Sequence, residues 1–87
     1  MEEYEIKEVA EILTEWNPLG DDAKKIKDLN GYRTEAIDII FHLSINENRT
    51  NAENIVIKVL SQAFDLFLTE NECIVPTQKI LNVLNKS

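Results

Sequence analysis

Three side chains near the middle of the chain have the types and the spacing of a metal or acid–base site. Glu35, Asp38 and His42 recur at i, i+3 and i+7, which places them on one stripe of an α-helix. An imidazole with two carboxylates can hold a divalent cation. A metal site normally takes a ligand from a second element as well, and His42 is the only histidine in the chain. An exposed helix stripe explains the same pattern. We therefore expect no metal or cofactor, and a small metal-dependent enzyme is only the alternative hypothesis.

Other reactive combinations are weaker still. The single cysteine, Cys73, follows the acidic stretch 70–72, and neighbouring carboxylates raise the pKa of a thiol. We expect Cys73 to pack as a small apolar residue rather than to act as a nucleophile with His42 as its base. Glu11 and Glu15 lie one helical turn apart, but acid–base catalysis needs a cleft that shifts their pKa values. We therefore expect no catalytic residue.

Acidic charge is concentrated at the start of the chain. Residues 1–22 hold eight acidic residues and one basic residue, whereas the remaining residues are balanced, so the net charge of −7 belongs to this segment. Such charge attracts basic proteins and repels the phosphates of nucleic acids and of anionic membranes. The lysines of residues 24–27 do not offset it, because acidic residues flank them. The favoured hypothesis is a non-enzymatic protein-interaction module with an unknown basic partner, for example an acidic inhibitor or an immunity-type factor.

The expected binding surface runs along the first helix to its C-terminal end. Pro18 pushes Asn17 out of the α region, so the helix ends there. Trp16 either closes the end of the bundle or, where it is exposed, forms an interface hot spot. Tyr32 and Glu35 are expected to join Asn17 in a polar cluster at this corner. The predicted binding residues are Glu8, Glu11, Glu15, Trp16, Asn17, Tyr32 and Glu35.

Helices must position these side chains, because apolar residues recur at helical spacing and no stretch alternates like a strand. We predict a first helix over residues 3–16 and a second long helix over residues 32–45. Between them, residues 21–30 are expected to form a short helix with Asp21 as its N-cap. The polar stretch 46–49 is expected to be a loop.

The second half of the chain shows two further helix starts. Residues 50–53 match a capping box with Thr50 as the N-cap, and the apolar pattern that follows continues to Leu68 with Phe67 on the core face. Pro76 suits the first turn of a final helix that ends near Asn85, with extended chain before it.

These elements predict an all-α fold with a single domain over residues 1–87. We expect a small antiparallel bundle of three longer helices plus one or two short ones. The third helix is apolar over more than half of its surface, so it is either central or packed against a partner. A homodimer through its second apolar stripe is therefore one expectation, with Ile57, Phe64 and Leu68 at the contact.

Features of targeting sequences are missing from the chain. No apolar run approaches the ~20 residues that cross a bilayer, and the acidic N-terminus does not resemble a secretion signal. A single cysteine cannot form an intrachain disulfide, which suits a reducing compartment. We expect a cytoplasmic protein.

Two segments resemble the YugE-like family of small Bacillus-type proteins. Residues 15–20 read Glu-Trp-Asn-Pro-Leu-Gly and residues 32–38 read Tyr-Arg-Thr-Glu-Ala-Ile-Asp. They are similar to that family's Trp-Asp-Pro-x-Gly and Tyr-x-Thr-Glu motifs, although Asn17 stands where aspartate is usual and residues 21–30 form a longer insertion. The resemblance implies a small all-α fold without an established activity. Similar patterns occur in small proteins suspected of being immunity factors against toxins.

Overall fold

The computed structural model describes residues 2–27, 29–46 and 51–85, and every regular element in these ranges is helical. The predicted all-α fold class is therefore confirmed for these residues. The elements in chain order are α1 (Glu3–Trp16), the short 3₁₀ segments η1 (Gly20–Lys25) and η2 (Asn30–Tyr32), α2 (Arg33–Asn46), α3 (Ala52–Phe64) and α4 (Glu70–Leu84).

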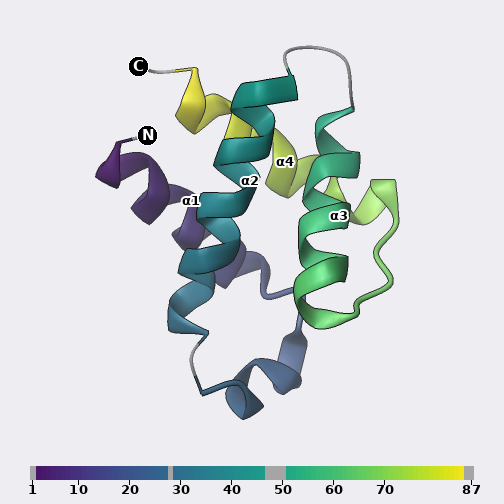
Figure 1. Ribbon diagram of the computed structural model, residues 1–87. Helices are drawn as coiled ribbons and strands as arrows, with labels where there is room; N and C mark the ends of the chain where they lie inside the picture. Colours follow the sequence, from purple (N-terminus) through teal and green to yellow (C-terminus); the bar gives the residue numbers. More distant parts are fainter. Residues whose placement is uncertain (1, 28, 47–50, 86–87) are drawn as a thin grey trace.

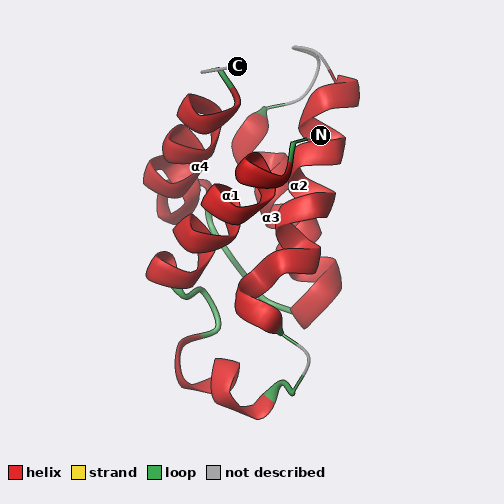
Figure 2. Cartoon of the chain, turned by 90° about the vertical axis from the view of Figure 1, so that its left-hand side faces the viewer, coloured by secondary structure: helices red, strands yellow, loops and turns green. Residues whose placement is uncertain are grey.

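The α-helices form a bundle of two layers. In Figure 1, α2 and α3 lie side by side in front, with α1 and α4 behind them. α1 and α3 run towards the lower end, α2 runs upwards, and α4 returns obliquely towards the upper end. Each helix contacts the next one in the chain, and α1 also contacts α4, which closes the ring. The two 3₁₀ segments lie at the lower end, where the chain passes from α1 to α2 (Figures 1 and 2).

Helical spacing of apolar residues builds the core. Each turn of a helix brings side chains three or four residues apart to the same face, and that face is buried. Full burial of one such side chain stabilises the fold by roughly 1.5–3 kcal/mol. Every long helix and the η2 turn contribute to it, and the largest fully buried side chains are Tyr32, Leu13, Ile39, Leu60 and Ile80.

The first half of the chain follows the prediction closely. The helix predicted over residues 3–16 is α1, and the one predicted over 32–45 is α2, displaced by one residue. The short helix predicted over residues 21–30 is present only in part, as a 3₁₀ helix over Gly20–Lys25, and the predicted N-cap is wrong, because Leu19 takes that position and Asp21 lies inside the helix. A segment of this length makes too few α-helical hydrogen bonds to offset the free energy of helix nucleation.

α3 differs from the prediction at both ends. Its N-cap is Asn51, whose side chain accepts the N–H of Glu53, and not Thr50, which lies outside the described residues together with residues 47–49. The helix ends at Phe64, because Asp65 adopts a left-handed φ of 57° and donates its N–H to Ser61. Phe67 therefore lies in a loop and is 98% exposed, rather than on the core face.

α4 starts more than a turn before the predicted position. Thr69 Oγ1 accepts the N–H of Glu72, and the Glu72 carboxylate accepts the N–H of Thr69, which together form a capping box. Pro76, predicted in the first turn, lies near the middle of the helix, where it has no N–H to donate to the carbonyl four residues before it. Its ring is buried, and Val75 before it is helical rather than extended.

The second apolar stripe of α3 is partly covered within the chain. Ile57, Phe64 and Leu68 are half-buried and pack against the core. Phe64 meets Tyr32 edge to face, with ring centroids 5.9 Å apart. A homodimer through this stripe stays a prediction, and it would have less apolar area to bury than the sequence pattern suggests.

Among the described residues, no helix is both long and apolar enough to cross a bilayer.

Candidate functional site

Glu8, Glu11 and Glu15 form a carboxylate stripe on the side of α1 that faces away from the core. All three side chains are exposed. Within the described part of the chain, none of them makes a hydrogen bond or an ion pair. Like charges three or four residues apart on a helix repel one another by a few tenths of a kcal/mol. The carboxylate stripe is therefore surface charge that does not serve the packing of the fold.

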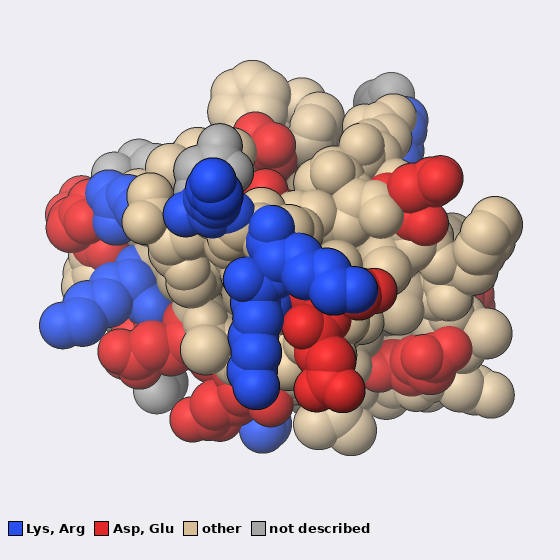
Figure 3. Space-filling model, turned by 90° about the horizontal axis from the view of Figure 1, so that it is seen from below, with Lys and Arg blue, Asp and Glu red and all other residues tan. Residues whose placement is uncertain are grey.

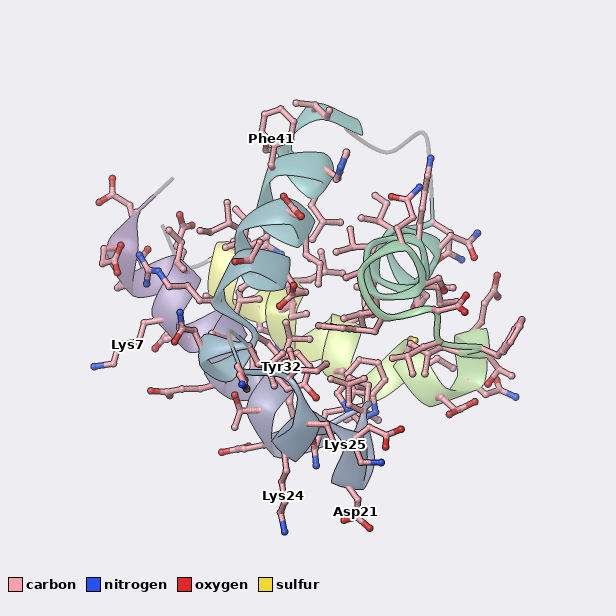
Figure 4. The ribbon with its side chains drawn as sticks, turned by 60° about the horizontal axis from the view of Figure 1, so that its bottom comes forward. Lys7, Asp21, Lys24, Lys25, Tyr32 and Phe41 are labelled. Carbon is pink, nitrogen blue, oxygen red and sulfur yellow. The ribbon has the colours of Figure 1, made fainter. Side chains whose placement is uncertain are left out.

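Asn17 and Tyr32 form a hydrogen-bonded corner at the C-terminal end of α1. The Tyr32 hydroxyl donates to Oδ1 of Asn17 at 2.9 Å and accepts the backbone N–H of Leu19 at 3.4 Å. Nδ2 of Asn17 donates to the Gly20 carbonyl at 3.1 Å. Tyr32 is buried, and Figure 4 shows its ring in the interior of the lower end. The two residues do lie together as predicted, and their contact joins α1 to η2.

The environment of Tyr32 keeps its hydroxyl protonated. Burial raises the pKa of Tyr32, the hydrogen bond from Leu19 lowers it, and the negative charge of Glu35 raises it further. A neutral hydroxyl is the form that can donate to Asn17.

Glu35 is buried, with 8% of its surface exposed, so its predicted place on an exposed polar stripe is wrong. Tyr32 and Ala36 near it in the chain are buried as well, so the start of α2 faces the core. Trp16 is half-buried and packs against the core. It therefore closes the end of the bundle in part and leaves the rest of its surface open to a partner.

The turn that precedes α2 has a left-handed backbone over three residues. Asn30, Gly31 and Tyr32 have φ angles of 50°, 62° and 63°. This conformation costs roughly 1–2 kcal/mol for a residue with a Cβ. The Thr14 hydroxyl lies 2.8 Å from the Ala10 carbonyl and 3.2 Å from the Gly31 carbonyl, so its one proton is shared between α1 itself and this turn. A Cβ at Gly31 would lie at an ordinary 3.5 Å from Thr14 Oγ1, which means that φ, not space, favours glycine there.

The alternative hypothesis of a metal site at Glu35, Asp38 and His42 finds no support in the geometry. Asp38 and His42 are exposed and line a shallow hollow of 220 Å³ between α2 and α3, whereas Glu35 is buried. Among residues 2–27, 29–46 and 51–85, no group of three His, Cys, Asp or Glu side chains lies close enough together to hold a metal ion. Cys73 is fully buried, and burial together with the charges of Glu72 and Glu53 raises the pKa of its thiol to about 11. At neutral pH this thiol is protonated and unsuited to nucleophilic attack.

Basic side chains at the lower end are mixed with acidic ones. Lys24 and Lys25 are exposed, and Lys25 forms an ion pair with Asp22 at 3.4 Å. Figure 3, seen from below, shows basic side chains beside acidic ones rather than a uniform basic face, and Figure 4 shows Lys7 and Lys24 projecting into solvent. At the side of the bundle, Arg33 pairs with Glu3 at 2.7 Å and lowers the pKa of that carboxyl.

A groove that the sequence did not reveal runs between α1 and α4. The two helices lie side by side in Figure 2, and the groove between them has a volume of 280 Å³. The sequence pattern predicts Pro76 and Lys79 on the final helix but Val75 in extended chain before it. The capping box of Thr69 and Glu72 is the signal that places Val75 on the helix as well. The residues that line the groove are Ile12, Glu15 and Trp16 from α1 and Val75, Pro76 and Lys79 from α4.

No protein-family model, curated protein or solved structure matches the chain. The resemblance to the YugE-like family accordingly stays a prediction.

Proposed function

We propose that the protein is a non-enzymatic protein-interaction module that binds a basic partner through the carboxylate stripe of α1. The observation that carries the proposal is the state of Glu8, Glu11 and Glu15. They share one exposed helix face, and in the described structure no cation pairs with them. Their mutual repulsion destabilises α1 slightly. A basic partner would offset this repulsion, so the stripe would be more favourable in a complex than in the isolated protein.

Aromatic residues at both ends of the stripe support the same function. Tyr4 lies one turn before Glu8 and is 44% exposed, and half-buried Trp16 directly follows Glu15. Tyrosine and tryptophan are over-represented among the residues that dominate binding energy at interfaces. The carboxylates would accelerate the encounter with a basic protein, and the aromatic rings would slow its dissociation.

An inhibitor or immunity-type factor for a basic toxin is a concrete form of this proposal. The small size and the acidic first helix support it, together with the resemblance to the YugE-like family. A cytoplasmic location belongs to the same proposal.

The test is an affinity capture with the whole protein immobilised, followed by binding measurements on the captured partner. Wild type at low salt should retain a basic protein, and Glu8→Gln/Glu11→Gln/Glu15→Gln should not. With the purified partner, the triple variant should lower the association rate constant at least tenfold, and the wild-type rate should fall steeply with salt.

A matched variant removes the same charge elsewhere. Asp38→Asn/Asp65→Asn/Glu70→Gln neutralises three exposed carboxylates on other elements and should keep the partner. If wild type and both variants capture the same proteins, binding through the stripe is refuted. Removal of the three α1 carboxylates would then have no more effect than removal of three carboxylates elsewhere on the surface.

A further inference from the structure

The groove between α1 and α4 offers an apolar surface beside the carboxylate stripe. Ile12 and Trp16 are half-buried and pack partly against the core, and they expose the rest of their surface on the α1 side. Val75 on the α4 side is 61% exposed. Buried Pro76 lies between the helices. A partner side chain that enters the groove would contact these apolar residues.

The groove itself is lined by one carboxylate and one cation, and the excess negative charge lies beyond it on α1. Its α1 wall carries Glu15, and the other two carboxylates of the stripe continue along the same helix away from the groove. Its α4 wall carries one cation, Lys79, and no ion pair joins Lys79 to Glu15 within the described residues. An occupant that matches this distribution has an apolar face for the groove and a row of cations on the side that faces α1.

We propose that the groove binds the apolar face of a basic amphipathic helix that belongs to the partner protein. The inference rests on the function proposed above and names the kind of partner segment. Apolar side chains one turn apart on that helix would contact Trp16 and Val75, and its lysine or arginine residues would reach the carboxylate stripe. The methylene chain of Lys79 can lie along the apolar contact while its ammonium stays in water.

A second copy of this chain fits the groove less well. Each copy has a net charge of −7, and a symmetric contact would bring the two carboxylate stripes towards each other. Like charges placed across an interface oppose association. The charge distribution thus favours a basic helix over self-association.

The only tryptophan of the chain lines the groove, so its fluorescence reports occupancy directly. The probe is a synthetic helix of leucine and lysine in which all leucines share one face. The comparison peptide has the same composition in an order that destroys the apolar face. The amphipathic peptide should shift the Trp16 emission to shorter wavelength and bind more tightly than the scrambled one.

Two variants locate the contact. Val75→Asp places a charge in the groove, and Ile45→Asp makes the same change at a residue of similar exposure on α2, with exposed fractions of 61% and 58%. Both add one negative charge, which by itself would strengthen binding of a cationic peptide. The loss of one buried valine contact should nevertheless weaken binding to Val75→Asp about tenfold, and Ile45→Asp should bind like wild type.

The outcomes separate this inference from the function on which it rests. If the two peptides bind equally, if neither binds, or if Val75→Asp binds like Ile45→Asp, the groove does not hold an amphipathic helix. If both peptides bind wild type equally but neither binds Glu8→Gln/Glu11→Gln/Glu15→Gln, the stripe still attracts basic partners. In that case only the proposal about the groove is refuted. Sedimentation of the wild type alone completes the test: a dimer that Val75→Asp dissociates would show that a second copy covers the groove, and would overturn the proposal.

Discussion

Tyr32 combines a left-handed backbone with one of the most buried side chains in the protein. Bulky residues rarely have positive φ, because the Cβ then approaches the following carbonyl group. The strain is offset by burial of the ring, by its edge-to-face contact with Phe64, and by the hydrogen bonds of its hydroxyl to Asn17 and Leu19. A single residue thereby fixes the η2 turn against both α1 and α3.

Removal of the Tyr32 hydroxyl should destabilise the protein without changing its fold. In Tyr32→Phe the ring keeps its packing, but Oδ1 of Asn17 and the N–H of Leu19 lose their partner. We expect the free energy of unfolding to fall by about 1 kcal/mol, measured by urea denaturation. Tyr4→Phe, which removes an exposed hydroxyl, should change it by less than about 0.5 kcal/mol. Equal values for the two variants would mean that the corner contributes nothing to stability.

Helix ends in this chain are decided by short polar signals rather than by the extent of the apolar pattern. α4 begins where Thr69 and Glu72 satisfy each other's backbone N–H groups, although the valine before Pro76 suggests a later start. α3 ends at a left-handed Asp65, although apolar residues continue to Leu68. A capped end has its hydrogen bonds satisfied, whereas an uncapped one leaves polar groups of the backbone unpaired.

The capping box of α4 should therefore be measurable. Thr69→Ala removes the acceptor for the N–H of Glu72 and is expected to lower the free energy of unfolding by about 1 kcal/mol. Thr34→Ala changes an exposed threonine in the first turn of α2 and should stay within about 0.5 kcal/mol of wild type. Thermal unfolding followed by circular dichroism compares the two. An effect of Thr69→Ala no larger than that of Thr34→Ala would contradict a capping role.

At the scale of the whole molecule, the charge is uneven, whereas the α-helices close into one ring around a common core. The excess negative charge lies in the first 22 residues, most of it on α1, whose inner face joins the common core and whose Glu8, Glu11 and Glu15 form no ion pair within the described residues. Proteins commonly hold such unfavourable surface charge where binding requires it, at some expense of stability. The arrangement suits an interaction surface on a rigid helix.

Neutralising the stripe should stabilise the isolated protein. In Glu8→Gln/Glu11→Gln/Glu15→Gln, the loss of repulsion between neighbouring carboxylates should raise the free energy of unfolding by roughly 0.5 kcal/mol at low salt. The difference from wild type should shrink as salt is added, because salt screens exposed charges. Denaturation at low and high ionic strength measures both effects. A destabilised triple variant would show instead that these carboxylates support the fold.

Local pattern alone was sufficient for the helical class, for α1 and α2, and for the acidic face of the first helix. The periodicity of apolar residues and the distribution of charge depend only on residues that are near one another in the chain. In α1 and α2 the tertiary contacts favour the same helical structure as this local pattern. The sequence also predicts that Asn17 and Tyr32 lie close together, because they stand at the two ends of the segment that connects α1 to α2.

Tertiary structure alone decided the burial of Glu35, the exposure of Phe67 and the groove lined by Trp16 and Val75. Each depends on how two elements that are distant in the chain approach one another. Three residues with left-handed φ connect η1 to α2, and α4 packs along α1 from the far end of the sequence. A one-dimensional pattern identifies which side of a helix is apolar, but the free energy of packing determines which part of that side stays open to a partner.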